Sequence, residues 1–149
     1  MRQLLVPSMI VAALLGLATT AHADNKSDGV EAKKVIDTFL KNQSSPTRCG
    51  DNAALCVDNA VFVVTHKKDK DAKMDGPYTI KQLNDYVKGA LKEDQKVTID
   101  SITVDVKANT DLAIGFASLK VDETSVRSIF TLAKRDGKWK VMSITQENR

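Results

Sequence analysis

Residues 125–149, SVRSIFTLAKRDGKWKVMSITQENR, decide the fold of this chain. Two stretches rich in β-forming side chains flank Asp136-Gly137, and an Asp-Gly pair in that position is a strong signal for a tight hairpin. The single tryptophan, Trp139, opens the returning strand. We therefore predict that this hairpin, with strands over 126–134 and 139–146, forms the centre of a curved antiparallel sheet.

Two further strands are predicted before the hairpin, at residues 97–106 and 112–121, where apolar and polar side chains alternate. In the first of them the apolar positions are odd-numbered up to Ile99 and even-numbered from Ile102 onward. A slip of one residue is what a β-bulge produces, and we place the bulge near Asp100-Ser101. Because bulges bend strands, the sheet is expected to curl.

Two helices are predicted closer to the N-terminus, each with a capping box at its start. Asp28 is the expected N-cap of the first helix, with Glu31 as its partner, and this helix should end near Asn42. Thr79 and Gln82 form the same motif before the second helix. A short apolar strand at 60–65 and a solvated, charged hairpin tip at 67–75 are expected between the helices.

The first 23 residues have the pattern of a secretory signal peptide: the basic Arg2, an apolar run over 4–18, and the small-x-small site Ala21-His22-Ala23. The apolar run is shorter than the ~20 residues that span a bilayer. We expect cleavage after Ala23, a mature domain over 24–149 in the bacterial periplasm or outside the cell, and no membrane association after cleavage. A retained N-terminal anchor is the alternative.

The charge balance disfavours nucleic acid as a partner. The formal net charge of the chain is +3, and removing the signal peptide, with its one basic and no acidic residue, lowers it to +2. Nucleic-acid-binding domains usually carry a basic stripe, whereas basic and acidic residues are mixed along this chain.

Two cysteines, Cys49 and Cys56, are both in the exported part. An even, closely spaced pair in an oxidising compartment predicts a disulfide, with a turn at Gly50 bringing the thiols together. A redox-active pair is the alternative, although it usually has C-x-x-C spacing. We expect no metal and no cofactor, because the mature chain has one histidine, His66, and the charged tip lacks the glycine and glutamate of a calcium loop.

The order of elements resembles the nuclear-transport-factor-2-like superfamily, which has a cystatin-like α+β cone, and within it the SnoaL-like proteins. The residues that carry the resemblance are Asp58-Asn59-Ala60-Val61 before the first strand, Asp75-Gly76 with Ile80 at the second helix, and the ending from Thr131 to Val141. The resemblance implies an α+β roll with a sheet of four to six strands and two to three helices on its concave side. It also implies a pocket for a small apolar molecule inside the cone, and a homodimer through the outer sheet face.

Two residues are candidates for acid/base chemistry in such a pocket. Asp58 matches the acidic position before the first strand, and its alternative role is that of a turn or capping aspartate. His66 titrates near neutral pH, and its alternative is an exposed histidine at the end of a strand.

Four aromatic residues are candidates for lining the cavity. Tyr86 lies on the apolar stripe of the second helix, and its hydroxyl needs a partner if the ring is buried. Phe116, Phe130 and Trp139 lie on the predicted strands, and Trp139 could stack on a ligand; the alternative for all three is the core.

Three functions stay open at this point. The first is an exported domain that binds a small molecule in its cone without catalysis. The second is an enzyme of the isomerase, cyclase or dehydratase type that uses Asp58 or His66 with Tyr86. The third is a protein-interaction module. An enclosed cavity with convergent polar groups would favour the first two over the third.

Overall fold

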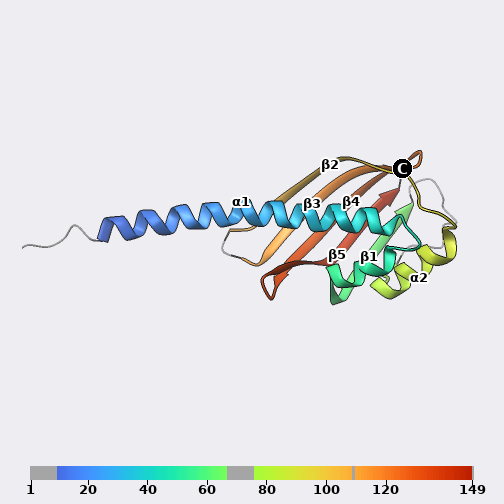
Figure 1. Cartoon of the computed structure of the whole chain (residues 1–149), viewed down its shortest axis with the longest axis horizontal. Coiled ribbons are helices and arrows are strands. Elements are labelled where there is room, and N and C mark those ends of the chain that lie inside the picture. The colour runs from blue at the N-terminus through green and yellow to red at the C-terminus, as the bar shows by residue number, and fades with distance from the viewer. Residues whose placement is uncertain (1–9, 67–75, 109, 149) are drawn as a thin grey trace, which may run out of the picture.

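A computed structural model describes the backbone of residues 10–66, 76–108 and 110–148, and the side chains of this part from Lys26 onward except that of His66. The charged tip at 67–75 and the first nine residues of the predicted signal peptide lie outside the described residues. The elements, in chain order, are α1 (Ile10–Gln43), the 3₁₀ helix η1 (Cys49–Leu55), β1 (Cys56–His66), α2 (Ile80–Ala90), β2 (Val97–Val106), β3 (Leu112–Val121), β4 (Thr124–Arg135) and β5 (Lys138–Asn148) (Figure 1).

The strands form one five-stranded sheet in the order β1-β5-β4-β3-β2. The predicted meander from β2 to β5 is confirmed, because each of these strands pairs with the next in antiparallel fashion. The prediction of a wholly antiparallel sheet is wrong, since β1 pairs with β5 in parallel and the sheet is mixed. No hairpin joins β1 to β5, so a turn does not impose an antiparallel direction on this pair.

The bulge in β2 is confirmed. Its pairing with β3 shifts register between Ile99 and Ser101, where the alternation of the sequence changes phase. The fold is thus the α+β roll with a curved sheet that the sequence predicts.

Helix α1 covers one face of the sheet, which we call the inner face; the opposite, helix-free face is the outer face (Figure 1). The centre of the core is aromatic. The ring of Phe39 on α1 stacks on Phe62 of β1, with centroids 5.8 Å apart, and meets Phe130 of β4 edge-on at 5.9 Å. Gly115 lets the helix approach closely, because a Cβ there would collide with the side chain of Ile36.

Helix α1 spans Ile10–Gln43, so the predicted N-cap at Asp28 is wrong. The helix continues through Asp28, and its N-terminal half extends past the sheet (Figure 1). The Asp28 carboxylate instead accepts hydrogen bonds from Lys134 and Trp139. Among the described residues, no helix combines the length and the apolar content needed to cross a bilayer.

Helix α2 starts as predicted. The Thr79 side chain accepts a hydrogen bond from the backbone of Gln82, and the Gln82 side chain accepts one from the backbone of Thr79. Its apolar face buries Leu83 and Val87, and the helix packs against η1 and β1 at one end of the sheet. This position leaves α2 as one wall of a cavity.

Candidate functional site

A cavity of about 290 Å³ opens between the C-terminal part of α1, helix α2 and one end of the sheet. We call it the end pocket. Each wall comes from an apolar position that the periodicity of its element turns inward. These positions are Leu40, Val64, Leu83, Val87, Leu119 and Val126.

Three side-chain amides form a row along the end pocket. Gln43, the last residue of α1, donates from Nε2 to Gln146 Oε1 at 3.4 Å. Gln146 in turn donates from Nε2 to Asn148 Oδ1 at 3.2 Å. We call Gln43, Gln146 and Asn148 the amide row; all three line the pocket, and none of them carries a charge.

The inner face of the sheet positions two members of the amide row. Gln146 lies opposite Ser128, and Asn148 lies opposite Val126, in the β4–β5 pairing. Residues directly opposite in an antiparallel pair share a face. Both Ser128 and Val126 are buried, and Val126 itself lines the end pocket. The last residues of β5 therefore point their amides into the cone, beside an apolar wall.

Ser128 adds a second polar feature to this end of the inner face. Its side chain is 2% exposed, and its Oγ has no hydrogen-bond partner in the described part of the chain. Buried hydroxyls are normally paired. The burial of Ser128 could have been predicted from the sequence, because in β4 it alternates with the apolar residues Val126 and Phe130 on the face that turns inward.

One carboxylate, that of Asp122, lines the described part of the end pocket. It belongs to the turn between β3 and β4, where its φ of 53° gives the left-handed backbone that aspartate tolerates. Its Oδ1 accepts from the backbone N–H of Lys96 at 3.1 Å, and its Oδ2 accepts from Gln95 Nε2 at 3.2 Å. These bonds tie the carboxylate to the start of β2.

The two predicted acid/base candidates are not brought together around the end pocket. Asp58 is exposed, in the irregular part of β1 between Cys56 and Val61, and it does not line the end pocket. The backbone of His66 pairs with Asn148 at the end of β1. The side chain of His66 lies outside the described residues.

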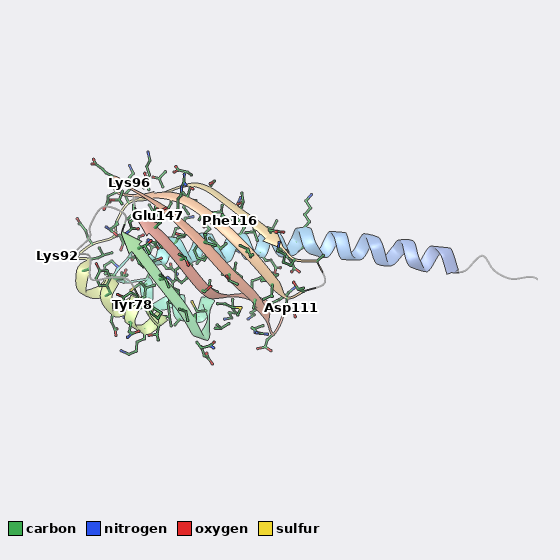
Figure 2. The ribbon with its side chains drawn as sticks, turned by 180° about the vertical axis from the view of Figure 1, so that it is seen from behind. Tyr78, Lys92, Lys96, Asp111, Phe116 and Glu147 are labelled. Carbon is green, nitrogen blue, oxygen red and sulfur yellow. The ribbon has the colours of Figure 1, made fainter. Side chains whose placement is uncertain are left out.

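Of the four aromatic candidates, Tyr86 lines the end pocket, at its rim and 52% exposed. Phe130 is fully buried in the core. Phe116 lies on the outer face, 50% exposed (Figure 2). Trp139 is buried, its ring 6.0 Å from Lys134 Nζ, and it lines a separate surface groove between α1, η1 and the β4–β5 hairpin.

Cys49 and Cys56 are free thiols in the structure, so the predicted disulfide is not formed. Cys49 is the first residue of η1 and Cys56 directly follows its last, so the seven steps between them, at ~2.0 Å per residue of 3₁₀ helix, separate them by about 14 Å. A disulfide needs ~5.5 Å between Cα atoms. The predicted turn at Gly50 does not fold the chain back. Burial raises the pKa of the Cys56 thiol to about 12, partly offset by the nearby charge of Lys140.

No group of three or more metal-ligating side chains occurs within the described ranges. The polar side chains that line the end pocket carry amides, hydroxyls and one carboxylate, which already accepts hydrogen bonds from Gln95 and Lys96. Such a set of groups suits a ligand that forms hydrogen bonds through uncharged polar atoms.

A scan against protein-family models finds no match, and a search of curated proteins finds none. Solved structures match over most of the chain. An NTF2-like protein of unknown function from Silicibacter pomeroyi shows a TM-score of 0.60 at 14% identity, with 88% of this chain and 98% of that chain covered.

Two further structures agree on the fold. An uncharacterised protein with a cystatin-like fold from Caulobacter vibrioides gives a TM-score of 0.62 at 13% identity, covering 82% of this chain and 90% of that one. A candidate ketosteroid isomerase from Parabacteroides distasonis gives a TM-score of 0.53 at 15% identity, covering 76% of this chain and 85% of that one. The chain thus has the NTF2-like, cystatin-like fold that its sequence resembles.

Proposed function

We propose that this protein is an exported domain that binds a small, mainly apolar molecule in the end pocket. The observation that carries the proposal is the combination of a cavity of about 290 Å³, apolar walls and a row of amides on one side. Ligand sites are typically concave and apolar, with a few placed polar groups, and begin at about 300 Å³. The fold alone would not support this, because one fold hosts many functions.

Export rests on the first 23 residues. The basic start, the apolar run and the Ala-x-Ala site are those of a cleaved signal peptide. Cleavage after Ala23 would cut α1 well before Ala32, the first buried residue of its described side chains, so the helix packed on the sheet would remain intact. We place the mature protein in the bacterial periplasm or outside the cell.

The test is native mass spectrometry of the protein purified from its own periplasm, comparing the natural chain with Ala90→Trp. Ala90, the last residue of α2, lines the end pocket and is exposed, so an indole there is expected to obstruct the opening of the cavity. Lys88→Trp is the matched control, on the same helix but outside the lining. We expect a bound small molecule in the natural chain and in Lys88→Trp, and its loss in Ala90→Trp. A ligand retained by Ala90→Trp would contradict the proposal.

A homodimer through the outer face is a second proposal, favoured by the apolar side chains exposed there. Phe116 and Ile129 are cross-strand partners that are 50% and 47% exposed, and Leu112 is 45% exposed. Arg127 and Glu147 are cross-strand partners beside them. A two-fold arrangement would bring the exposed apolar side chains of Phe116, Ile129 and Leu112 of one copy against those of the other.

Sedimentation of the natural chain and of Phe116→Glu tests the dimer. We expect the natural chain to sediment as a dimer and Phe116→Glu as a monomer. Val30→Glu, at an exposed position of α1 away from the outer face, should leave the dimer intact. A monomeric natural chain would contradict the proposal.

We rank an isomerase or cyclase activity below these proposals. Its support is likeness in fold to a candidate ketosteroid isomerase. The predicted base Asp58 does not line the end pocket, and Asp122 is already hydrogen-bonded to the start of β2. A general base must lie within hydrogen-bond reach of the proton it removes.

A further inference from the structure

We propose that the end pocket selects an uncharged ligand with a hydroxyl, ketone or carboxamide head group, and discriminates against carboxylates and ammonium ions. This inference rests on the proposed binding function and names the ligand class. It is drawn from the charge, pairing and position of the polar groups in the pocket.

The first step is the lack of a cationic side chain in the described lining. Besides the amide row, the side chains that line the pocket and can form strong hydrogen bonds are those of Ser44, Tyr86, Gln95, Asp122 and Thr124. No lysine, arginine or histidine belongs to the described lining. An anion placed there would be removed from water without a cationic partner from the described lining, and proteins avoid such unpaired buried charges.

The second step concerns cationic ligands. The carboxylate that lines the pocket is that of Asp122, and both of its oxygens are already accepting hydrogen bonds, from Lys96 N and Gln95 Nε2. Asp122 is also exposed, so its charge is screened by solvent. An ammonium ion would have to displace these bonds in order to pair.

The third step is the direction of the amide row. Donation runs from Gln43 to Gln146 and from Gln146 to Asn148, which uses one N–H of each glutamine. Gln43 Oε1, at the start of the row, accepts no hydrogen bond from the described residues. An amide offers both donors and an acceptor, so a head group that donates and accepts, such as a hydroxyl or a carboxamide, matches the row. A ketone matches its donors alone.

Ser128, beside the row on the adjacent strand, is also uncharged, although it does not line the end pocket. Its buried and unpaired Oγ lies on the inner face, opposite Gln146. A hydroxyl can either donate or accept but carries no charge. The polar features at this end of the inner face are thus neutral on both β4 and β5.

The experiment uses four probes with one naphthalene ring and different head groups: the carboxamide, the hydroxyl, the carboxylate and the methylammonium. Calorimetric titration of the mature natural chain at pH 7 gives an affinity for each. We expect the carboxamide and hydroxyl probes to bind at least about tenfold more tightly than the two charged probes. Equal or tighter binding of the carboxylate or ammonium probe would overturn the inference while leaving ligand binding itself intact.

A charge introduced into the row makes the test sharper. Gln146→Lys should reverse the preference toward the carboxylate probe, because the new ammonium would lie at the position of the central amide. Thr145→Lys, one residue away on the exposed outer face, is the matched control and should not change the preference. If no probe binds the natural chain and its native mass spectrum shows no ligand, the proposed function fails, and the inference fails with it.

Discussion

The Asp28 carboxylate lies 2.6 Å from the ammonium of Lys134 and joins α1 to β4 across 106 residues of sequence. The same oxygen accepts a hydrogen bond from Trp139 Nε1 at 3.3 Å. The side chains of Asp28 and Lys134 are 19% and 30% exposed, so solvent screens the pair only in part. This contact fixes α1 against the β4–β5 hairpin.

The contact predicts a pH dependence of stability. Its hydrogen bond to Asp28 raises the pKa of Lys134 above the ordinary 10.5, helped by the charges of Asp28, Glu31 and Asp111 and opposed by desolvation. A lysine whose pKa is raised by folding stabilises the fold fully below pH 10.5 and loses this contribution as pH rises through its folded pKa. The natural chain should therefore be more stable than Asp28→Asn at pH 7–9, by a margin that shrinks above pH 10.5.

Urea unfolding of both proteins across this range, followed by Trp139 fluorescence, measures the margin. Other groups that titrate in the same range are shared by the two proteins and cancel in the difference. Asp37→Asn, which removes an exposed ion pair to Lys41 within α1, is the control and should show only a small effect across the range. A margin for Asp28→Asn that stays constant up to pH 12 would contradict the assignment.

Gly115 and Gly89 should respond in opposite directions to the same substitution. A Cβ at Gly115 would overlap the side chain of Ile36 beneath α1, so Gly115→Ala should lower the free energy of unfolding by about 1–3 kcal/mol. Gly89 is exposed on α2, and a Cβ added there would meet no atom within 4 Å, so Gly89→Ala should raise it by up to ~1 kcal/mol. Urea unfolding of both variants measures these changes. If Gly115→Ala leaves the free energy of unfolding unchanged, α1 does not approach β3 as closely as the structure shows.

The two cysteines should be unreactive in the folded protein. Cys49 is fully buried and Cys56 is 7% exposed, and a pKa of about 12 keeps the Cys56 thiol protonated. Because this pKa is raised from 9.0, the neutral thiol stabilises the fold below pH 9.0, and the contribution falls as pH rises toward 12.

Alkylation with iodoacetamide at pH 8, read by mass spectrometry, tests this state. We expect no label on the folded chain and two labels after unfolding in urea without reductant. Unfolded protein from the periplasm that takes up label only after reduction would show that a disulfide forms in its own compartment.

The capping box of α2 predicts a local loss of stability. Thr79→Ala removes the oxygen that accepts from Gln82 N, and should cost about 0.5–2 kcal/mol. Thr79→Ser keeps that oxygen and should stay close to the natural chain. Thermal unfolding distinguishes the two, and equal stability of both variants would contradict the role of the cap.

The sheet could be predicted from the sequence because its signals are local. The change of phase between Ile99 and Ile102 marked the bulge, and Asp136-Gly137 marked the last hairpin, whose turn residues have positive φ in the structure. The parallel pairing of β1 with β5 could not be predicted in this way, since it depends on which free strand edge the chain reaches last. The start of α1 was missed because Asp28 suits an N-cap locally, whereas its partner Lys134 is distant in sequence.

The amide row was missed for a different reason. Gln146 and Asn148 fall in the last residues of the chain, where a polar composition suggests a solvated end. Their spacing from the buried Ile144 was nonetheless informative, because positions 144, 146 and 148 share one face of a strand. The aromatic residues drew attention instead, and of these Tyr86 alone lines the end pocket.

The placement of β5 between β4 and β1 has a consequence for how the molecule is made. Strand β1 is hydrogen-bonded to no strand of the described sheet except β5, so it cannot join the sheet until β5 has been synthesised. Until β5 is present, the sheet lacks the edge at which β1 pairs. Under the export proposed above, in which the chain passes a secretion channel in extended form, this order of pairing would postpone completion of the sheet until after passage.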